Sequence, residues 1–274
     1  MRIYVRVKNP QEINHSDSKM KNIWIFLIAF LGLTQLAQAQ DDLFGTPEKE
    51  PGKGFIITLN GSFDIPAADM AERFGLSYRV GPGLLYKTKT NWVFGIKTDF
   101  IFGNKIKEKG FLSNLMTENE GILAMNGIRS NVSFFERGYL AGFQAGRIFN
   151  FSSKNPDNGL LLLTSAGFVQ HKILINTSKS GYIPQLEGDY KKGYDRLANG
   201  WYLEQFAGYS YSSKTGFVNF NIGLDILAGF TQGRRNYLTD VQKPGNEKRF
   251  DLLYGIRGSW YIPVYKRKSD DFYF

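Results

Sequence analysis

The chain has 274 residues, and its 34 Lys and Arg against 25 Asp and Glu give a formal net charge of +9. An aromatic content of 15% with 22% charged residues excludes an intrinsically disordered chain. The absence of cysteine excludes disulfides, thiolate metal sites and a cysteine nucleophile. The 23 Phe, 15 Tyr and 30 Gly favour strands and turns over helices.

The N-terminal region carries a pattern typical of export. Residues 20–39 combine a short positive start, an apolar run from Ile23 to Leu33, and Ala37-Gln38-Ala39 as a small-x-small cleavage site before Gln40. This run is shorter than the ~20 apolar residues of a membrane-spanning helix, so we interpret it as a signal peptide. Residues 1–19 are polar and precede a second methionine, which indicates a wrongly assigned N-terminal extension. The alternative is an unusually long positive region of the signal peptide.

The remainder of the chain is moderately basic. Removing residues 1–39 takes away five bases and two acids and leaves a net charge of +6. The sequence contains no DNA-binding or RNA-binding motif, and we therefore expect no nucleic-acid partner.

Beyond residue 40 the apolar residues recur with a period of two. Such alternation predicts strands with one apolar and one polar face, because successive strand side chains point to opposite sides. The predicted strands are residues 54–64, 75–87, 91–103, 138–150, 159–174, 200–212, 216–230 and 248–264.

Two architectures could produce this alternation: a soluble barrel or sandwich, and an outer-membrane barrel whose apolar face meets lipid. The predicted strands run past ten residues, whereas soluble strands average ~5–6. The polar face is rich in glycine, which leaves room for a narrow, filled interior. Large aromatic residues at strand ends suit interfacial girdles; they are Tyr86, Trp92, Phe102, Trp201, Tyr209 and Trp260.

We therefore predict an all-β fold, an eight-stranded antiparallel transmembrane up-and-down β-barrel with long extracellular loops. Residues 54–265 would form the barrel, residues 40–53 a periplasmic N-terminal segment and residues 266–274 a periplasmic C-terminal tail. The cell outer membrane is the predicted location.

The connections between predicted strands alternate in length, as such barrels require. The predicted outer connections are residues 65–74, 104–137, 175–199 and 231–247, and the inner ones are 88–90, 151–158 and 213–215. Residues 121–136 also alternate. We interpret this segment as an extension of the fourth strand above the membrane, or as a hairpin in an outer loop.

The whole mature chain resembles the outer-membrane β-barrel proteins of the Bacteroidota, a class of small OmpA-like and PorT-like barrels. The resemblance rests on Ala-Gln-Ala before Gln40, the alternating strands and the terminal Phe274. It also rests on the stretches 170–173, 184–190, 192–197 and 229–235. It implies the fold and the membrane. Members of this class include accessory barrels of secretion and gliding machinery and subunits attached to the outer-membrane assembly machine.

Charged residues on the polar face form a candidate structural network. Inside eight strands, buried charges need opposite partners. The set comprises Arg79, Lys97, Asp99, Glu204, Asp225, Asp251 and Arg257. We expect Arg257 to pair with Asp225 or with a carboxylate one strand further away. The alternative is that these charges line a path for ions or solutes.

The outer loop 175–199 is a candidate partner-binding surface, because Tyr and Arg are favoured at interfaces. Its candidate residues are Tyr182, Tyr190, Tyr194 and Arg196, and the alternative is a long solvated loop. His171 is the one histidine after residue 39, near the outer end of the fifth strand, with Ser165, Ser178, Asp189 and Asp195 within reach in sequence. A lone histidine at an exposed barrel rim is interpreted as a plain polar residue.

We therefore expect no catalytic set, no cofactor and no metal. The expected function is that of a non-enzymatic barrel: an accessory or scaffold subunit of a secretion or assembly complex, or a surface-binding protein. Its expected partners are outer-membrane lipid and proteins of an outer-membrane complex. The alternatives are a small porin-like channel and a lipid-modifying enzyme.

Overall fold

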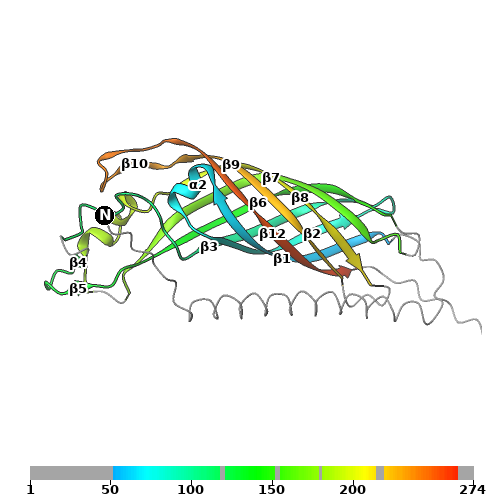
Figure 1. The fold of residues 1–274 in the computed structure, drawn as a ribbon, viewed down its shortest axis with the longest axis horizontal. Coiled ribbons are helices and arrows are strands. Elements are labelled where there is room, and N and C mark those ends of the chain that lie inside the picture. Colours follow the sequence, from blue (N-terminus) through cyan, green and yellow to red (C-terminus); the bar gives the residue numbers. More distant parts are fainter. Residues whose placement is uncertain (1–51, 118–120, 152–154, 179–180, 214–218, 265–274) are drawn as a thin grey trace, which may run out of the picture. The chain divides into compact units, whose positions relative to one another are not determined.

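The computed structural model describes residues 52–117, 121–151, 155–178, 181–213 and 219–264. The predicted signal peptide, the N-terminal extension and the predicted tail 266–274 lie outside the described residues. Within the described part, eight long strands close into one antiparallel barrel (Figure 1), which confirms the predicted strand count and fold class.

Every long strand of the barrel pairs with its neighbours in chain order, and the first strand closes the barrel on the last. The order around the barrel is β1-β12-β9-β8-β7-β6-β3-β2. The strands are β1 (Gly54–Ala67), β2 (Ser77–Lys87), β3 (Trp92–Gly103), β6 (Ser133–Phe149), β7 (Gly159–Asn176), β8 (Ala198–Ser212), β9 (Asn219–Gly233) and β12 (Lys248–Val264).

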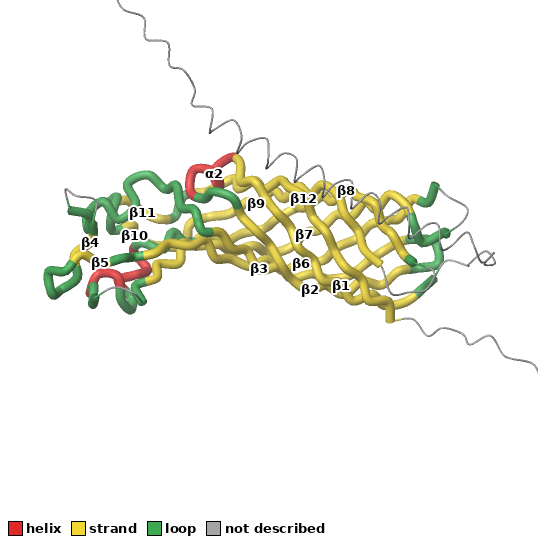
Figure 2. The backbone as a smooth tube through the Cα atoms, turned by 60° about the horizontal axis from the view of Figure 1, so that its bottom comes forward, coloured by secondary structure: helices red, strands yellow, loops and turns green. Residues whose placement is uncertain are grey.

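Several strands reach further toward the outer end than the alternation indicated. Both interpretations of the segment 121–136 hold for a part of it. It contains a small hairpin of β4 (Ile122–Leu123) and β5 (Arg129–Ser130), and its last residues begin β6. Two further short strands pair beyond β9, namely β10 (Arg235–Leu238) and β11 (Lys243–Gly245). The outer connections of the barrel are thus partly structured (Figure 2).

The first outer connection contains a short helix that the alternation did not predict, α2 (Ala68–Arg73). Its sequence ADMAER has good helix formers, and Met70 and Arg73 turn inward and are buried. Two 3₁₀ turns, η1 (Pro184–Leu186) and η2 (Tyr190–Gly193), shape the third outer connection. No helix among the described residues is long and apolar enough to cross a membrane.

The apolar faces of the strands point outward. On β9, Leu224 is 66% exposed and Ile226 52% exposed, while the alternate residues Asn221 and Asp225 are buried. This arrangement reverses the usual distribution of a soluble protein and matches a barrel whose exterior meets hydrocarbon.

Aromatic side chains form two rows on this exterior. One row contains Tyr86, Trp92, Tyr209 and Trp260, near the short connections, and the other contains Tyr78, Phe102, Trp201 and Phe250. Along each strand the two rows are eight to ten residues apart. At ~3.3 Å per residue and a strand tilt near ~40°, this separation corresponds to roughly 20–25 Å, close to the height of a membrane apolar band.

The lumen contains two apolar clusters. The lower cluster lies near the short connections and comprises Ile56, Leu85, Val93, Ile148, Leu161, Leu163, Phe206 and Tyr261. The upper cluster fills the outer half of the lumen with Ile101, Leu140, Val169, Tyr202, Leu227 and Leu253, and continues into the outer connections. Charged side chains occupy the level between the two clusters.

The facing of β9 predicts how a charge on its exterior behaves. Leu224→Arg places a base near the middle of the apolar band and should destabilise the protein by about 2–4 kcal/mol. Gln232→Arg, beyond the outer aromatic row, should cost about 0–1 kcal/mol. Urea unfolding in phospholipid vesicles measures both values. Equal stability of Leu224→Arg and the unaltered protein would contradict the assignment of the lipid face.

Candidate functional site

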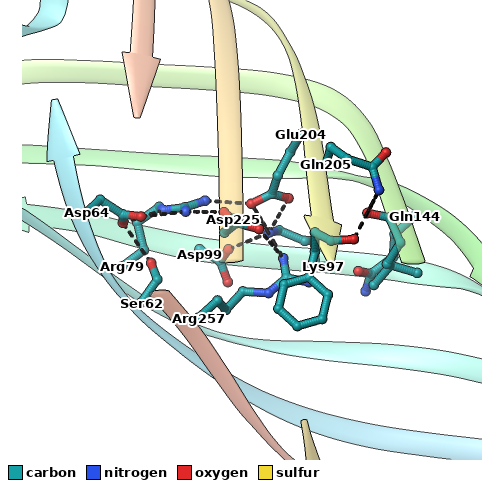
Figure 3. A network of polar contacts seen from close by, with 12 residues as sticks. Ser62, Asp64, Arg79, Lys97, Asp99, Gln144, Glu204, Gln205, Asp225 and Arg257 are labelled. Atoms are coloured by element: carbon teal, nitrogen blue, oxygen red, sulfur yellow. Dashed lines mark hydrogen bonds and ion pairs between the residues drawn. The ribbon is translucent and has the colours of Figure 1, made fainter. Parts of the chain in front are cut away.

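The charged layer of the lumen is centred on Arg79 of β2 (Figure 3). Its Nε and Nη2 donate to the two oxygens of Asp64 at 2.8 and 2.9 Å. Nη1 donates to Glu204 Oε1 at 2.6 Å, and Nη2 also donates to Asp225 Oδ2 at 2.5 Å. One guanidinium therefore joins β2 to its neighbour β1 and, across the lumen, to β8 and β9.

Two further bases complete the layer. Lys97 Nζ lies 2.5 Å from Glu204 Oε2 and 2.9 Å from Asp99 Oδ2. Arg257 Nη1 lies 3.2 Å from Asp225 Oδ1 and 3.5 Å from Glu204 Oε1. The Arg257 guanidinium also stands 4.2 Å from the centroid of the Phe206 ring. Glu204 thus meets all three bases.

The layer is almost fully withdrawn from solvent. Its three bases and four carboxylates have side chains no more than 3% exposed. Isolated charges in such surroundings are very unfavourable, and the set persists because nearly every charge meets an opposite one. Arg79 is bonded through all of its nitrogens, whereas Nε of Arg257 has no hydrogen-bond partner. Arg79 is therefore the better satisfied of the two guanidinium groups.

Small residues make room for this packing. A Cβ at Gly142 would lie 2.4 Å from the Tyr202 hydroxyl and 2.5 Å from the carbonyl oxygen of Ala166. Glycine at this position lets the Tyr202 side chain reach from β8, past β7, to the backbone of β6.

The structure brings six of the seven predicted lumen charges together, namely Arg79, Lys97, Asp99, Glu204, Asp225 and Arg257. Asp251 lies apart, toward the outer end, where its Oδ2 is 2.9 Å from His171 Nε2 and accepts a hydrogen bond from the Thr231 hydroxyl. Asp64 was missed. It follows the polar-face residues Asn60 and Ser62 of the first strand, so the alternation contained the signal that could have found it.

His171 is buried inside the barrel, and the expectation of an exposed rim histidine was wrong. Its side chain is 1% exposed, and the Phe74 ring lies edge-on to it at 5.5 Å. Among the described residues, no hydrogen bond joins it to the serines or aspartates considered beside it, which are Ser165, Ser178, Asp189 and Asp195. The described ranges also contain no group of three His, Asp or Glu arranged to hold a metal ion.

The outer connections assemble into one structure, which we call the outer head: residues 68–76, 104–117, 121–132, 177–178, 181–197 and 234–247. Arg196 lies at its centre. Its Nη2 is 2.8 Å from Asp240 Oδ2, and its Nε is 3.1 Å from Glu108 Oε1. Arg73 lies 2.9 Å from the other oxygen of Glu108 and donates to the Arg196 carbonyl at 3.1 Å. These four residues come from the four outer connections, so the contacts clamp all of them together.

The head has an apolar interior beneath this clamp. Its buried residues include Phe111, Leu112, Ile122, Ile183, Leu186 and Tyr194. The Tyr194 hydroxyl accepts a hydrogen bond from Asn114 Nδ2 at 3.1 Å. Of the four predicted partner-binding residues, Tyr194 and Arg196 are 2% exposed and belong to this interior, while Tyr182 and Tyr190 are 62% and 76% exposed.

Exposed apolar side chains gather on the β4–β5 hairpin and the segment beside it. Met125 N donates to the Tyr182 carbonyl at 2.9 Å, which fastens the hairpin to the third outer connection. We call this group the tip patch; its members Met116, Leu123, Met125, Ile128 and Tyr182 are 43–78% exposed. Clustered exposed apolar residues are typical of interaction surfaces.

The sequence matches no protein-family model and no curated protein. Several solved structures are similar to this chain. Neisserial surface protein A has a TM-score of 0.42 and 13% identity, over 77% of this chain and 99% of that one. Ail of Yersinia pestis, in a complex with the heparin analogue sucrose octasulfate, has a TM-score of 0.40 and 9% identity, over 76% and 97%. OprG from Pseudomonas aeruginosa has a TM-score of 0.36 and 10% identity, over 80% and 100%. Identities this low carry no argument about a shared ligand or activity.

The unequal bonding of Arg79 and Arg257 predicts unequal effects of their removal. Arg79→Gln leaves three buried carboxylates short of a partner and should destabilise the barrel by about 3–5 kcal/mol, with a smaller loss for Arg257→Gln. Combining Arg257→Gln with Asp225→Asn should cost less than the sum of the two single changes. Urea unfolding in vesicles, followed by tryptophan fluorescence, gives these values. A strictly additive double variant would show that Arg257 and Asp225 do not interact.

The clamp predicts an acid-sensitive head. Burial raises the pKa of Glu108, but the guanidinium groups of Arg73 and Arg196 outweigh this and hold it below its ordinary value. The stabilisation from Glu108 is therefore complete above the ordinary carboxyl pKa of about 4.3 and is lost as the pH falls through the lowered value.

Amide hydrogen exchange across residues 104–117 should accelerate in that acid range, after correction for the intrinsic pH dependence of exchange. In Glu108→Gln this segment should already exchange faster at neutral pH, and lowering the pH should accelerate its exchange less than in the unaltered protein. Equal exchange rates at neutral pH and equal acceleration by acid in the two proteins would contradict the clamp around Arg196.

Proposed function

We propose that the protein is a non-enzymatic integral outer-membrane barrel that presents the outer head to a protein partner. The observation that carries this proposal is the clamp around Arg196. It joins four connections into a structure with its own buried interior and an exposed apolar tip. Four long loops that served only to connect strands would not need such a shared centre.

The exterior of the barrel supports the membrane location. Apolar side chains cover the outward face between two aromatic rows, and the closed sheet leaves no unpaired edge. A lipid bilayer satisfies both features, because it removes the apolar face from water and tolerates only closed sheets.

The interior disfavours the channel alternative. Seven charged side chains fill the middle of the lumen, with apolar clusters above and below them. The cavity beside Lys87 and Tyr261, near the short connections, has a volume of about 20 Å³, enough for one water molecule. A small porin-like channel would need a continuous aqueous path through these layers.

The enzymatic alternative finds little support at His171. This side chain is buried beside the Phe74 ring, and its Nε2 is already bonded to Asp251. A lipid-modifying enzyme needs its catalytic groups at the membrane boundary.

The tip patch indicates the chemistry of the partner. Methionine is flexible and polarisable and adapts to differently shaped apolar surfaces, and tyrosine adds a large, rigid contact area. We therefore infer a protein partner that offers an apolar surface. This role fits an accessory or scaffold subunit of an outer-membrane complex of the kind the sequence resembles.

Site-specific photocrosslinking in cells tests this function. A photoreactive phenylalanine analogue at Tyr182 should capture one reproducible protein, identified by mass spectrometry. Met125→Asp combined with Ile128→Asp should abolish the capture while the barrel folds normally. The analogue at Tyr211, far from the head at the other end of β8, is the matched control and should not capture that protein. A head that captures no specific protein, or captures it equally well with the charged tip, would contradict the proposed function.

A further inference from the structure

Two bases stand directly opposite each other on neighbouring strands at the outer rim of the barrel. The register of β6 and β7 pairs Arg137 with Lys172. Both are partly exposed and alternate with buried neighbours, so they lie on the outward face, two residues beyond Tyr139 on β6. Like charges in directly opposed positions destabilise a sheet unless something compensates them.

The protein itself offers these two bases no outward acid. Arg137 Nη1 donates to the Glu136 carbonyl, and its guanidinium lies 5.1 Å from the centroid of the Phe135 ring. The Glu136 carboxylate is on the lumen side of the sheet, where it accepts a hydrogen bond from the Ser77 hydroxyl. Among the described residues, neither Arg137 nor Lys172 makes a side-chain ion pair with a carboxylate.

The surrounding row is equally free of acids. Continuing around the barrel at this level, the register brings Gln170 opposite Asn199, then Asn199 opposite Gln232, and Gln232 opposite Lys248. Arg234 donates to Asn199 Oδ1 at 2.5 Å. The outward side chains at these register positions are therefore positive or neutral, which favours an anion from outside the chain.

The aromatic row gives the height of the two bases relative to the membrane. Phe102 is the register partner of Arg137, and the rings of Tyr139 and Phe168 lie just below with their centroids 6.1 Å apart. Aromatic belts mark the boundary between hydrocarbon and headgroups. Bases just beyond such a belt lie at the level of lipid phosphates.

We propose that Arg137 and Lys172 form a second site, which we call the phosphate clamp, that binds the phosphate of a phosphorylated lipid headgroup in the outer leaflet. An arginine guanidinium and a lysine ammonium on adjacent strands can both contact one phosphate, and its negative charge would relieve the repulsion between them. This inference rests on the proposed outer-membrane location. It does not depend on a protein partner for the head.

The opposite end of β6 provides a matched comparison. Arg147 also faces outward, but its guanidinium lies 5.6 Å from the rings of both Trp92 and Phe149. Its register partners are Trp92 and Leu162, neither of which is charged. Arg147 is therefore a single base held by aromatic faces, with no second base opposite it on a neighbouring strand.

The test uses the full chain in phosphatidylcholine vesicles that contain diphosphoryl lipid A or the same lipid after dephosphorylation. Lipid retained after gentle detergent extraction is counted by native mass spectrometry. The unaltered protein should retain the phosphorylated lipid at least tenfold more than the dephosphorylated one. Arg137→Gln with Lys172→Gln should lose this preference, and Arg147→Gln should keep it. Circular dichroism confirms that each variant is folded.

Four results would overturn the phosphate clamp. Equal retention of the phosphorylated and dephosphorylated lipids, or a preference that survives in the double variant, would contradict the phosphate clamp and leave the proposed membrane location unaffected. Displacement of the lipid by inorganic phosphate at equal concentration would show a free-anion site instead of a lipid site. A chain that does not insert into vesicles would overturn the proposed membrane location and, with it, the phosphate clamp.

Discussion

The contact between the Arg79 guanidinium and the carboxylates of Asp64, Glu204 and Asp225 is the constraint on which the remaining structure depends. These four charges are buried, and each is tolerable only while the others stay in place. They come from four strands, of which β8 and β9 are far from β2 around the barrel. A slip of one residue in any of these strands would turn its charge toward the lipid and its apolar face inward. The charged layer therefore specifies the register as well as the closure of the barrel.

The layered lumen explains how the barrel supports the head. The apolar cluster above the charged layer runs without a break from Leu140 and Tyr202 into Phe111, Leu186 and Tyr194. Arg196 then ties the four outer connections together at the top of this cluster. The tip patch is consequently carried on a packed column and not on a free loop. A preorganised surface loses less conformational entropy when it binds.

The strands were predictable because a barrel wall has a period of two, and that period is visible in a single sequence. The same parity predicted seven inward-facing charges, six of which meet in the charged layer, and it contained the missing Asp64 as well. The head was not predictable in this way. Its clamp joins Arg73, Glu108, Arg196 and Asp240, which are far apart in the chain and follow no repeat. Tyr194 and Arg196 were expected at an interface because tyrosine and arginine are favoured there. The same two residue types also suit a buried polar core, which is where these two lie. Only three-dimensional packing distinguishes the two.

We infer that the lumen is closed and that the barrel acts as a support for the outer head. Single-channel recording of the purified full chain in planar lipid bilayers measures whether ions pass through the lumen. The unaltered protein should give a baseline current without discrete steps, even after its insertion is verified independently. Uniform current steps, with a size that changes in Arg79→Gln, would show a conducting lumen instead of a filled one.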